Sequence, residues 1–129
     1  LPDPQKHSSL FGKKNLKGVP VMIFEQRELD LGMVKKGEKR TFSYPFVNRG
    51  DAPMSISIIT ACECTTTNVD EIAGKTFKPG EGGEIKVIFD SKEKDYSELI
   101  DIEILLDQTL PGSEIPIVEK LYYKFDIEK

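Results

Sequence analysis

Two cysteines separated by one residue, Cys62 and Cys64, are the only thiol-bearing residues of this 129-residue chain. In an extended segment, side chains at positions i and i+2 point to the same face, with Cα atoms about 6.5–7 Å apart. This spacing is at the upper limit for a disulfide, and a local bend would bring the two sulfur atoms together. The leading interpretation is structural: the pair, as thiols or as a local cystine, fixes a loop where the chain leaves one sheet.

Two chemical roles remain as alternatives for the same pair. Two thiolates can bind Cu(I), whereas zinc takes four ligands and the chain has no second cysteine pair. Thiol–disulfide exchange is the other alternative, although the pair lacks the Cys-x-x-Cys setting at a helix start and a cation beside it in the sequence. The negative charge of Glu63 disfavours a neighbouring thiolate. We expect no cofactor, and Cys62 and Cys64 are the only candidate metal ligands.

Other residue types that support catalysis occur without the partners that they need. A serine hydrolase requires a positioned histidine, and the single histidine of this chain, His7, lies in the N-terminal segment. Asp101 and Glu103 alternate with apolar residues, which is typical of a solvated strand face rather than an acid–base pair. We therefore expect a protein that is not an enzyme.

Turn residues mark two loops that a rigid scaffold would display. One contains the run Asn-Arg-Gly-Asp, and the other contains the cysteine pair with the threonine that follows it. Binding residues are found disproportionately on such loops. The candidate binding residues are Asn48, Arg49, Asp51, Cys62, Glu63, Cys64 and Thr65.

The charge balance limits the classes of partner. Lys and Arg number 18 against 22 Asp and Glu, which gives a formal net charge of -4. This mild acidity argues against nucleic acid, because phosphate binding needs a concentrated basic surface.

No apolar run approaches the roughly 20 residues of a membrane-spanning helix. A chain that begins at Leu1 rather than Met is interpreted as a processed or trimmed form, so a signal peptide or lipid anchor can have preceded it.

Short stretches of alternating apolar and polar residues must position these loops. From Val21 onward the apolar residues recur at every second position between turn residues, which is typical of β-strands. The strands are expected at 21–24, 29–31, 41–48, 54–58, 85–89, 100–106 and 121–127. We predict an all-β sandwich of about seven or eight antiparallel strands over residues 21–129, preceded by an N-terminal tail or linker at 1–20.

Two irregularities stand out in this pattern. Pro45 cannot donate a ladder hydrogen bond, which predicts an edge or a bulge within its strand. Ile88 and Leu105 break the polar alternation of their strands, and Leu99 and Tyr122 lie nearby in the pattern. We expect these apolar residues to cover a corner of the core beneath the tail, with an exposed patch for a partner as the alternative.

A longer block combines three elements in a fixed order: Asn48-Arg49-Gly50 at the end of a phenylalanine-rich strand, Cys62-Glu63-Cys64-Thr65, and Pro79-Gly80-Glu81. This block resembles the bacterial domain-of-unknown-function family numbered 1573, which has an Asn-x-Gly strand end, a Cys-Gly-Cys-Thr element and a Pro-Gly-Glu turn. The resemblance covers roughly Ile23 to Leu106. Glu63 stands where that family usually has glycine, so the chain departs from the family at its cysteine element.

The resemblance implies an immunoglobulin-like β-sandwich of the Hydin type. Many members of the family are exported or lipid-anchored proteins of Bacteroides-like bacteria, and the family has no settled biochemical activity. We therefore expect a non-catalytic, extracytoplasmic module, periplasmic or at the cell surface, that has a binding or structural role. Its expected partner is a protein or a glycan of the cell envelope. Copper binding or thiol redox chemistry at Cys62 and Cys64 is the alternative function.

Overall fold

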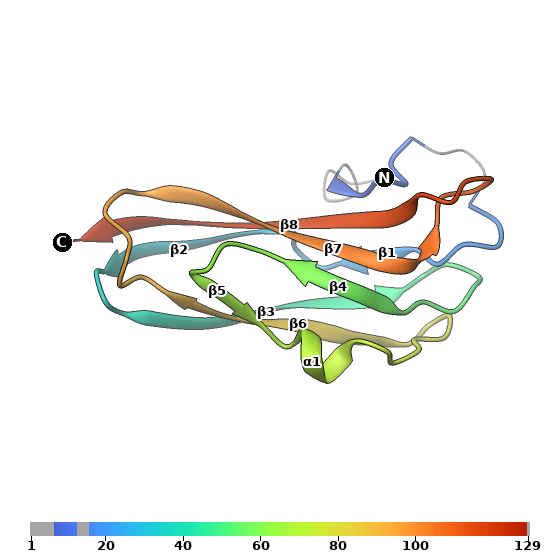
Figure 1. Ribbon diagram of the computed structural model, residues 1–129, viewed down its shortest axis with the longest axis horizontal. Helices are drawn as coiled ribbons and strands as arrows, with labels where there is room; N and C mark the ends of the chain where they lie inside the picture. The colour runs from blue at the N-terminus through green and yellow to red at the C-terminus, as the bar shows by residue number, and fades with distance from the viewer. Residues whose placement is uncertain (1–6, 13–15, 129) are drawn as a thin grey trace.

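Two four-stranded sheets pack face to face in the computed structural model, which describes residues 7–12 and 16–128 (Figure 1). Sheet 1 has the strand order β1-β3-β6-β5, and sheet 2 has the order β2-β8-β7-β4. The elements are β1 (Met22–Phe24), β2 (Glu28–Lys35), β3 (Lys39–Asn48), β4 (Ile56–Thr60), β5 (Thr65–Thr67), α1 (Val69–Ile72), β6 (Gly82–Asp90), β7 (Glu98–Thr109) and β8 (Pro116–Glu128). The predicted all-β sandwich is confirmed.

Period-2 alternation builds the core between the sheets. On β7 every second side chain from Ile100 to Leu106 is buried, and Asp101 between them is exposed. Burying an aliphatic side chain of this size contributes roughly 1.5–3 kcal/mol, so the strand is fixed with this face inward. The other sheet supplies aromatic residues to the same core, including Tyr44, Phe46 and Phe89.

One strand pair departs from the antiparallel expectation. β2 pairs with β8 in parallel, whereas each other adjacent strand pair described in the two sheets is antiparallel. The chain leaves sheet 1 after Phe24 and enters sheet 2 at Glu28 without reversing its direction. Because β1 and β2 run the same way on opposite sheets, the second of them lies parallel to β8.

Pro45 lies where β3 has a strand neighbour on one side only. It pairs with Glu84 of β6, while β1 on the other side reaches only as far as Phe24, opposite Phe46. The carbonyl of Pro45 accepts a hydrogen bond from the backbone N–H of Glu25 beyond the end of β1. The missing N–H therefore breaks no ladder bond between strands, and the predicted edge position is confirmed.

A buried ion pair links the two sheets to the N-terminal segment. Arg27 lies at the crossing from β1 to β2, and its Nη2 donates to Glu119 Oε1 at 2.7 Å. Both side chains are almost completely buried, at 1% and 0% exposure. Ser8 Oγ donates to the other carboxylate oxygen at 2.7 Å, and Leu10 is buried in the core. Part of the N-terminal segment is thus anchored to the sandwich, as a cap over this carboxylate.

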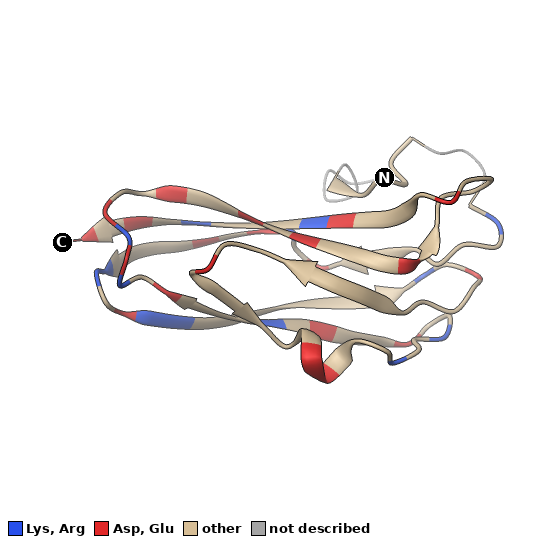
Figure 2. Cartoon of the chain, viewed as in Figure 1, with Lys and Arg blue, Asp and Glu red and all other residues tan. Residues whose placement is uncertain are grey.

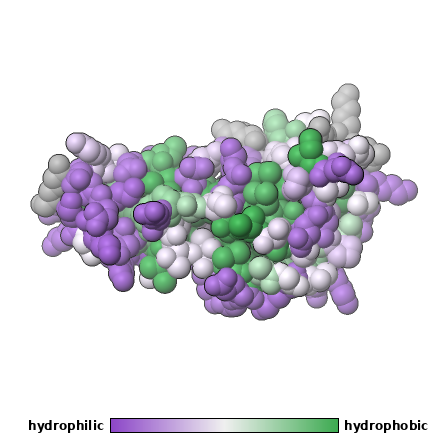
Figure 3. Space-filling view, viewed as in Figure 1, coloured by the Kyte–Doolittle hydropathy of each residue, from purple (hydrophilic) through white to green (hydrophobic). Residues whose placement is uncertain are grey.

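The polarity of the surface changes along the long axis of the molecule. In the space-filling view, apolar surface lies over the middle of the face, where β4 runs in front, and Ile58 of β4 is 47% exposed (Figure 3). The end that carries the loop between β6 and β7 is mainly hydrophilic in the same view. Within residues 7–12 and 16–128, no helix combines the length and apolar character needed to cross a membrane.

Candidate functional site

The cysteine pair forms a local disulfide at the crossing between the two sheets. β4 belongs to sheet 2 and β5 to sheet 1, and the Cys62–Cys64 disulfide lies in the turn that joins them. The backbone N–H of Thr65 donates to the carbonyl of Cys62 at 3.0 Å, which closes the turn and brings the cysteine Cα atoms to 5.2 Å. This distance lies within the usual range for a disulfide. The structure therefore has the local cystine of the leading interpretation.

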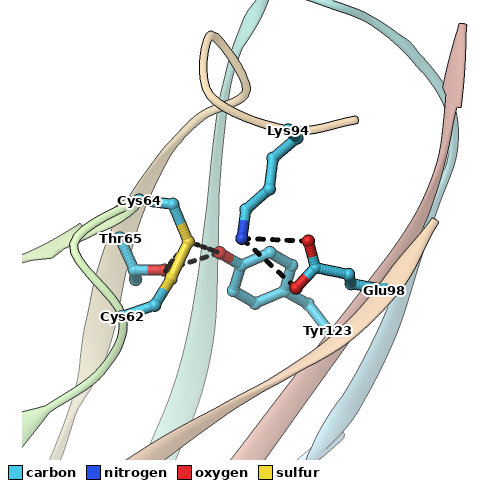
Figure 4. The surroundings of a disulfide bond; sticks show 6 residues. All are labelled: Cys62, Cys64, Thr65, Lys94, Glu98 and Tyr123. Atoms are coloured by element: carbon cyan, nitrogen blue, oxygen red, sulfur yellow. Dashed lines mark hydrogen bonds and ion pairs between the residues drawn. A yellow bond between two sulfur atoms is a disulfide. The ribbon is translucent and has the colours of Figure 1, made fainter. Parts of the chain in front are cut away.

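Two hydroxyl groups contact the disulfide from its inner side (Figure 4). Thr65 Oγ1 lies 3.2 Å from Cys62 Sγ and 3.4 Å from Cys64 Sγ. Tyr123 OH lies 2.5 Å from Thr65 Oγ1 and 3.7 Å from Cys64 Sγ. Because Tyr123 belongs to β8 and Thr65 to β5, this contact joins sheet 2 to sheet 1 directly beneath the disulfide.

Tyr123 is held rigidly in the core. Its ring makes edge-to-face or tilted contacts with Phe42 and Phe89, at centroid distances of 5.0 and 5.3 Å, and the residue is fully buried. Burial raises the pKa of Tyr123 to about 12, although the hydrogen bond with Thr65 acts in the opposite direction. The phenol therefore keeps its proton at physiological pH and remains a hydrogen-bond donor.

A lysine that the sequence does not place near the cysteines lies beside them in space. Lys94 comes from the loop between β6 and β7, and its Nζ lies 3.1 Å from a carboxylate oxygen of Glu98. Figure 4 shows this pair next to the hydroxyl of Tyr123, on the side of the disulfide that faces the loop. The fold therefore brings a cation, Lys94, close to the cysteines although the sequence has none beside them. The carboxylate of Glu98 neutralises the charge of Lys94.

The disulfide opens onto a surface groove of about 880 Å³. Its lining comes from the disulfide turn, the loop after β6 and the adjoining ends of strands in sheet 1. The lining residues are Lys39, Cys62, Glu63, Cys64, Thr66, Ile88, Asp90, Lys92, Glu93 and Lys94. Three lysines face three acidic residues, so the charges balance, and Figure 2 shows both signs mixed along this end of the molecule. We call this feature the disulfide groove.

The second predicted loop is organised around a buried amide. Asn48 is completely buried, and its Oδ1 accepts hydrogen bonds from the backbone N–H groups of Val21 and Gly50. Its Nδ2 donates to the carbonyls of Ala52 and Phe77 at 2.8 and 3.0 Å. A partner on the surface cannot touch this side chain, so Asn48 is a structural residue of the loop.

The remaining candidates of that loop lie far from the disulfide. Arg49 is exposed, and Asp51 Oδ1 accepts a hydrogen bond from the backbone N–H of Gly18 at 2.7 Å. Arg49 follows the last residue of β3, whereas Lys39, the first residue of the same ten-residue strand, lines the disulfide groove. The two candidate loops therefore occupy opposite ends of the sandwich, and the structure does not bring them together.

Ile88 and Leu105, which break the strand pattern, do not form one patch with Leu99 and Tyr122. Ile88 lies on sheet 1 in the disulfide groove, whereas Leu99, Leu105 and Tyr122 belong to sheet 2. Tyr122 is covered by the N-terminal segment, because the ring of His7 lies 4.7 Å from it, centroid to centroid. The expected cover by the tail applies to Tyr122, while Ile88 and Leu99 are 45% and 62% exposed.

Sequence reasoning placed Tyr123 in the strand expected at 121–127 but not in the site. The available signal was a phenol at an inward-facing strand position, since a buried tyrosine hydroxyl needs a hydrogen-bond partner. Lys94 and Glu98 carried no signal, because loop geometry brings them to the disulfide. Among the described residues, no group of three or more His, Cys, Asp or Glu side chains is placed to hold a metal ion.

Solved structures with the same fold support the sandwich assignment. A protein of unknown function from Porphyromonas gingivalis W83 matches with a TM-score of 0.66 and 21% identity over 90% of this chain and 50% of its own. This chain therefore spans half the length of that protein. The ASH / PapD-like domain of human CEP192 matches with a TM-score of 0.65 and 7% identity, covering 90% of this chain and 89% of that domain.

The YadV chaperone gives a TM-score of 0.57 at 10% identity, over 84% of this chain and 52% of its own. At these identities the likenesses show the fold alone, which is immunoglobulin-like and PapD-like. No curated protein shows significant similarity in sequence. The family model described as "Protein of unknown function (DUF1573)" matches residues 22–115, which include both the disulfide turn and the buried Asn48. The chain belongs to the DUF1573 family.

Proposed function

We propose that this domain is a non-catalytic, extracytoplasmic module that binds a protein partner through the disulfide groove. The observation that carries the proposal is the groove itself: about 880 Å³, displayed at one end of a rigid sandwich and floored by a covalently fixed turn. Loops held by a rigid scaffold are the usual place for binding in sandwich folds. A preformed turn also lowers the entropy cost of ordering the surface on binding.

A protein partner fits the groove better than a glycan. The described lining mixes charges of both signs with the exposed side chain of Ile88, and it contains no aromatic ring on which a sugar could stack. Thr66 of the lining belongs to β5, the edge strand of sheet 1, which has no further strand beyond it within the described residues. An extended peptide can pair with such an edge while its side chains occupy the groove. The likeness in fold to a protein named as a chaperone supports the same choice.

The non-catalytic part of the proposal rests on where the histidine lies. His7 contacts Glu28 and Tyr122 of sheet 2, and no residue of that sheet lines the disulfide groove. The extracytoplasmic part rests on the disulfide, since such bonds persist in oxidising compartments and are rare where glutathione keeps thiols reduced.

Site-specific photo-crosslinking tests the proposed surface. A photoreactive amino acid replaces exposed Glu63 in the groove, and a matched control carries it at exposed Arg49 at the other end of the sandwich. In cells that naturally encode the chain, we expect a discrete protease-sensitive adduct from position 63 and none from position 49. An adduct from position 49 alone, or a protease-resistant and glycosidase-sensitive adduct, contradicts the proposal.

The compartment is tested by the state of the thiols in those cells. Acid quenching and alkylation followed by mass spectrometry should find Cys62 and Cys64 joined and unalkylated. A chain whose two cysteines are both alkylated directly after quenching, together with its recovery in the cytosolic fraction, would refute the proposed localisation.

A further inference from the structure

Two hydroxyl groups lie beneath the disulfide. Together they carry two protons, and the hydrogen bond between them requires only one. Thr65 and Tyr123 each carry one hydroxyl proton, and the hydrogen bond between their oxygens at 2.5 Å uses one of the two. A disulfide sulfur has no proton to donate and can only accept. The second proton is therefore available to a sulfur atom, and both sulfurs lie within hydrogen-bonding distance of a hydroxyl.

The two sulfur atoms are not equivalent in this arrangement. Cys64 Sγ lies within reach of both hydroxyls, at 3.4 Å from Thr65 Oγ1 and 3.7 Å from Tyr123 OH. Cys62 Sγ contacts only the hydroxyl of Thr65, at 3.2 Å, among these two groups. If the bond opens, either hydroxyl can donate the available proton to a thiolate on Cys64, whereas only Thr65 can donate it to a thiolate on Cys62. Since the more stable thiolate leaves faster, Cys64 is the better leaving group.

The disulfide is also reachable from solvent. Both cysteines are partly exposed, and both line the disulfide groove. Equal numbers of lysines and acidic residues in the lining leave no net charge to repel an approaching thiolate. Tyr123, one of the two donors, is fully buried, so a thiol reaches the disulfide from the groove while the hydroxyls contact the sulfurs from the protein side.

We infer that the Cys62–Cys64 disulfide is a thiol-exchanging redox centre that accepts one electron pair from thiol compounds or from cysteine side chains. A thiolate attacks Cys62 Sγ, the bond between the two sulfurs breaks, and Cys64 leaves as a thiolate that accepts a hydrogen bond from Tyr123 or Thr65. A second thiol, once deprotonated, attacks the substrate sulfur of the mixed disulfide and releases the thiolate of Cys62. Two thiols are oxidised to one disulfide, the protein disulfide is reduced to two thiols, and the two protons of the substrate thiols pass to Cys62 and Cys64.

The inference goes beyond the binding function proposed above and does not require it. A small thiol reaches the disulfide whether or not the groove binds a protein. Each chain accepts a single electron pair, so the chemistry is stoichiometric unless another disulfide compound reoxidises the cysteines. Failure of the crosslinking experiment would therefore leave this inference intact. Failure of the redox experiments below would likewise leave the proposed binding function intact.

Reduction kinetics test the role of the hydroxyl pair. Excess dithiothreitol reduces the wild type, Tyr123→Phe and Thr65→Val under identical conditions, and alkylated thiols are counted by mass spectrometry. Losing a hydrogen bond to a developing thiolate should slow reduction about tenfold in Tyr123→Phe. Tyr44→Phe is the matched control, because it removes a buried phenol whose hydroxyl donates to the carbonyl of Tyr122 and not to sulfur. Equal rates in Tyr123→Phe and Tyr44→Phe would overturn the assignment.

Mapping of the mixed disulfide tests the direction of attack in the unmodified protein, so it does not depend on any variant folding. The wild type is treated briefly with reduced glutathione, quenched with iodoacetamide and digested. We expect glutathione on Cys62 and the alkyl group on Cys64, in at least about a tenfold excess over the reverse pattern. Equal labelling, predominant labelling of Cys64, or no mixed disulfide at all would overturn the inference.

Discussion

Two of the polar clusters in the apolar core differ in whether solvent reaches them. The cluster of Arg27, Glu119 and Ser8 is sealed, with the two charged side chains 1% and 0% exposed. The cluster around the Cys62–Cys64 disulfide shares a fully buried tyrosine with the core but opens onto the groove. The sealed cluster offers nothing to a ligand because both charged side chains are buried, although Arg27 Nε has no hydrogen-bond partner among the described residues. The open cluster combines buried donors with an accessible bond, which is the arrangement that chemistry needs.

Stability should therefore depend most on the sealed cluster, and reactivity on the open one. A buried charge is costly unless it is paired, and the pair itself can contribute little net stability. The hydrogen bond from Ser8 adds a second partner, besides Arg27, to the carboxylate of Glu119. Burial raises the pKa of Glu119, while Arg27 and Ser8 act in the opposite direction.

The largest effect is expected from Glu119→Ala, which leaves the guanidinium of Arg27 buried beside an empty space. We expect a loss of about 3–5 kcal/mol in the free energy of unfolding, measured by urea denaturation. The double variant Arg27→Met/Glu119→Leu should recover most of this loss, because a well-packed apolar pair needs no counter-charge. A single variant as stable as the wild type would show that the ion pair is not buried as described.

The next effect is a loss of stability at alkaline pH. The pKa of Tyr123 is raised from 10.0 to about 12, and the pKa of Tyr44 is raised further, both mainly by burial. Between pH 10 and 12 the unfolded chain has released these protons while the folded chain retains them, so stability falls as pH rises. For Tyr123 the loss amounts to about 2–3 kcal/mol by pH 12. Tyr123→Phe should flatten the decline in unfolding free energy over this range, and an unchanged slope would contradict it.

Removing the disulfide should cost less than removing the ion pair. The bond closes a ring across a single intervening residue, so it withdraws little entropy from the unfolded chain. Cys62→Ser/Cys64→Ser should lose about 1–2 kcal/mol in thermal or urea unfolding. Reduced wild type serves as the control and should lose a similar amount. A loss as large as that of Glu119→Ala would mean that the turn organises the whole sheet crossing.

The smallest effect is expected at the rim of the groove. Glu63 is exposed, so Glu63→Lys should change the free energy of unfolding by less than about 0.5 kcal/mol. The same variant should weaken the adduct formed by a photoreactive residue at Thr66, because it reverses a charge in the proposed binding surface. Lys124→Glu, on sheet 2 and outside the groove, is the matched charge reversal and should leave the adduct intact.

Much of the fold follows from local pattern. Alternating apolar residues such as those of β7 determine which face is buried, and Pro45 marks the end of a neighbouring strand. The parallel pairing of β2 does not follow, since a change of sheet without a change of direction leaves no mark in a period-2 pattern. The only sign in the sequence that Glu119 is buried is its position on β8, where it alternates in phase with Ile117 and Leu121.

Part of the candidate site was also predictable from local sequence. The bend at Cys62 and Cys64 is local and follows from two cysteines one residue apart in a turn. Tyr123 contacts Thr65 from 58 positions away through sheet packing, and a loop brings Lys94 into the same groove as the cysteines. Such contacts are set by tertiary structure, which periodicity does not report.

The amide of Asn48 ties together chain segments that would otherwise open separately. It holds Val21 before β1, Gly50 in the following turn and Phe77 in the connection to β6. Hydrogen exchange at the Gly50 N–H should accordingly be slow for a surface turn, because releasing it requires the three segments to separate together. This end of the molecule would then respond to heat as one cooperative unit.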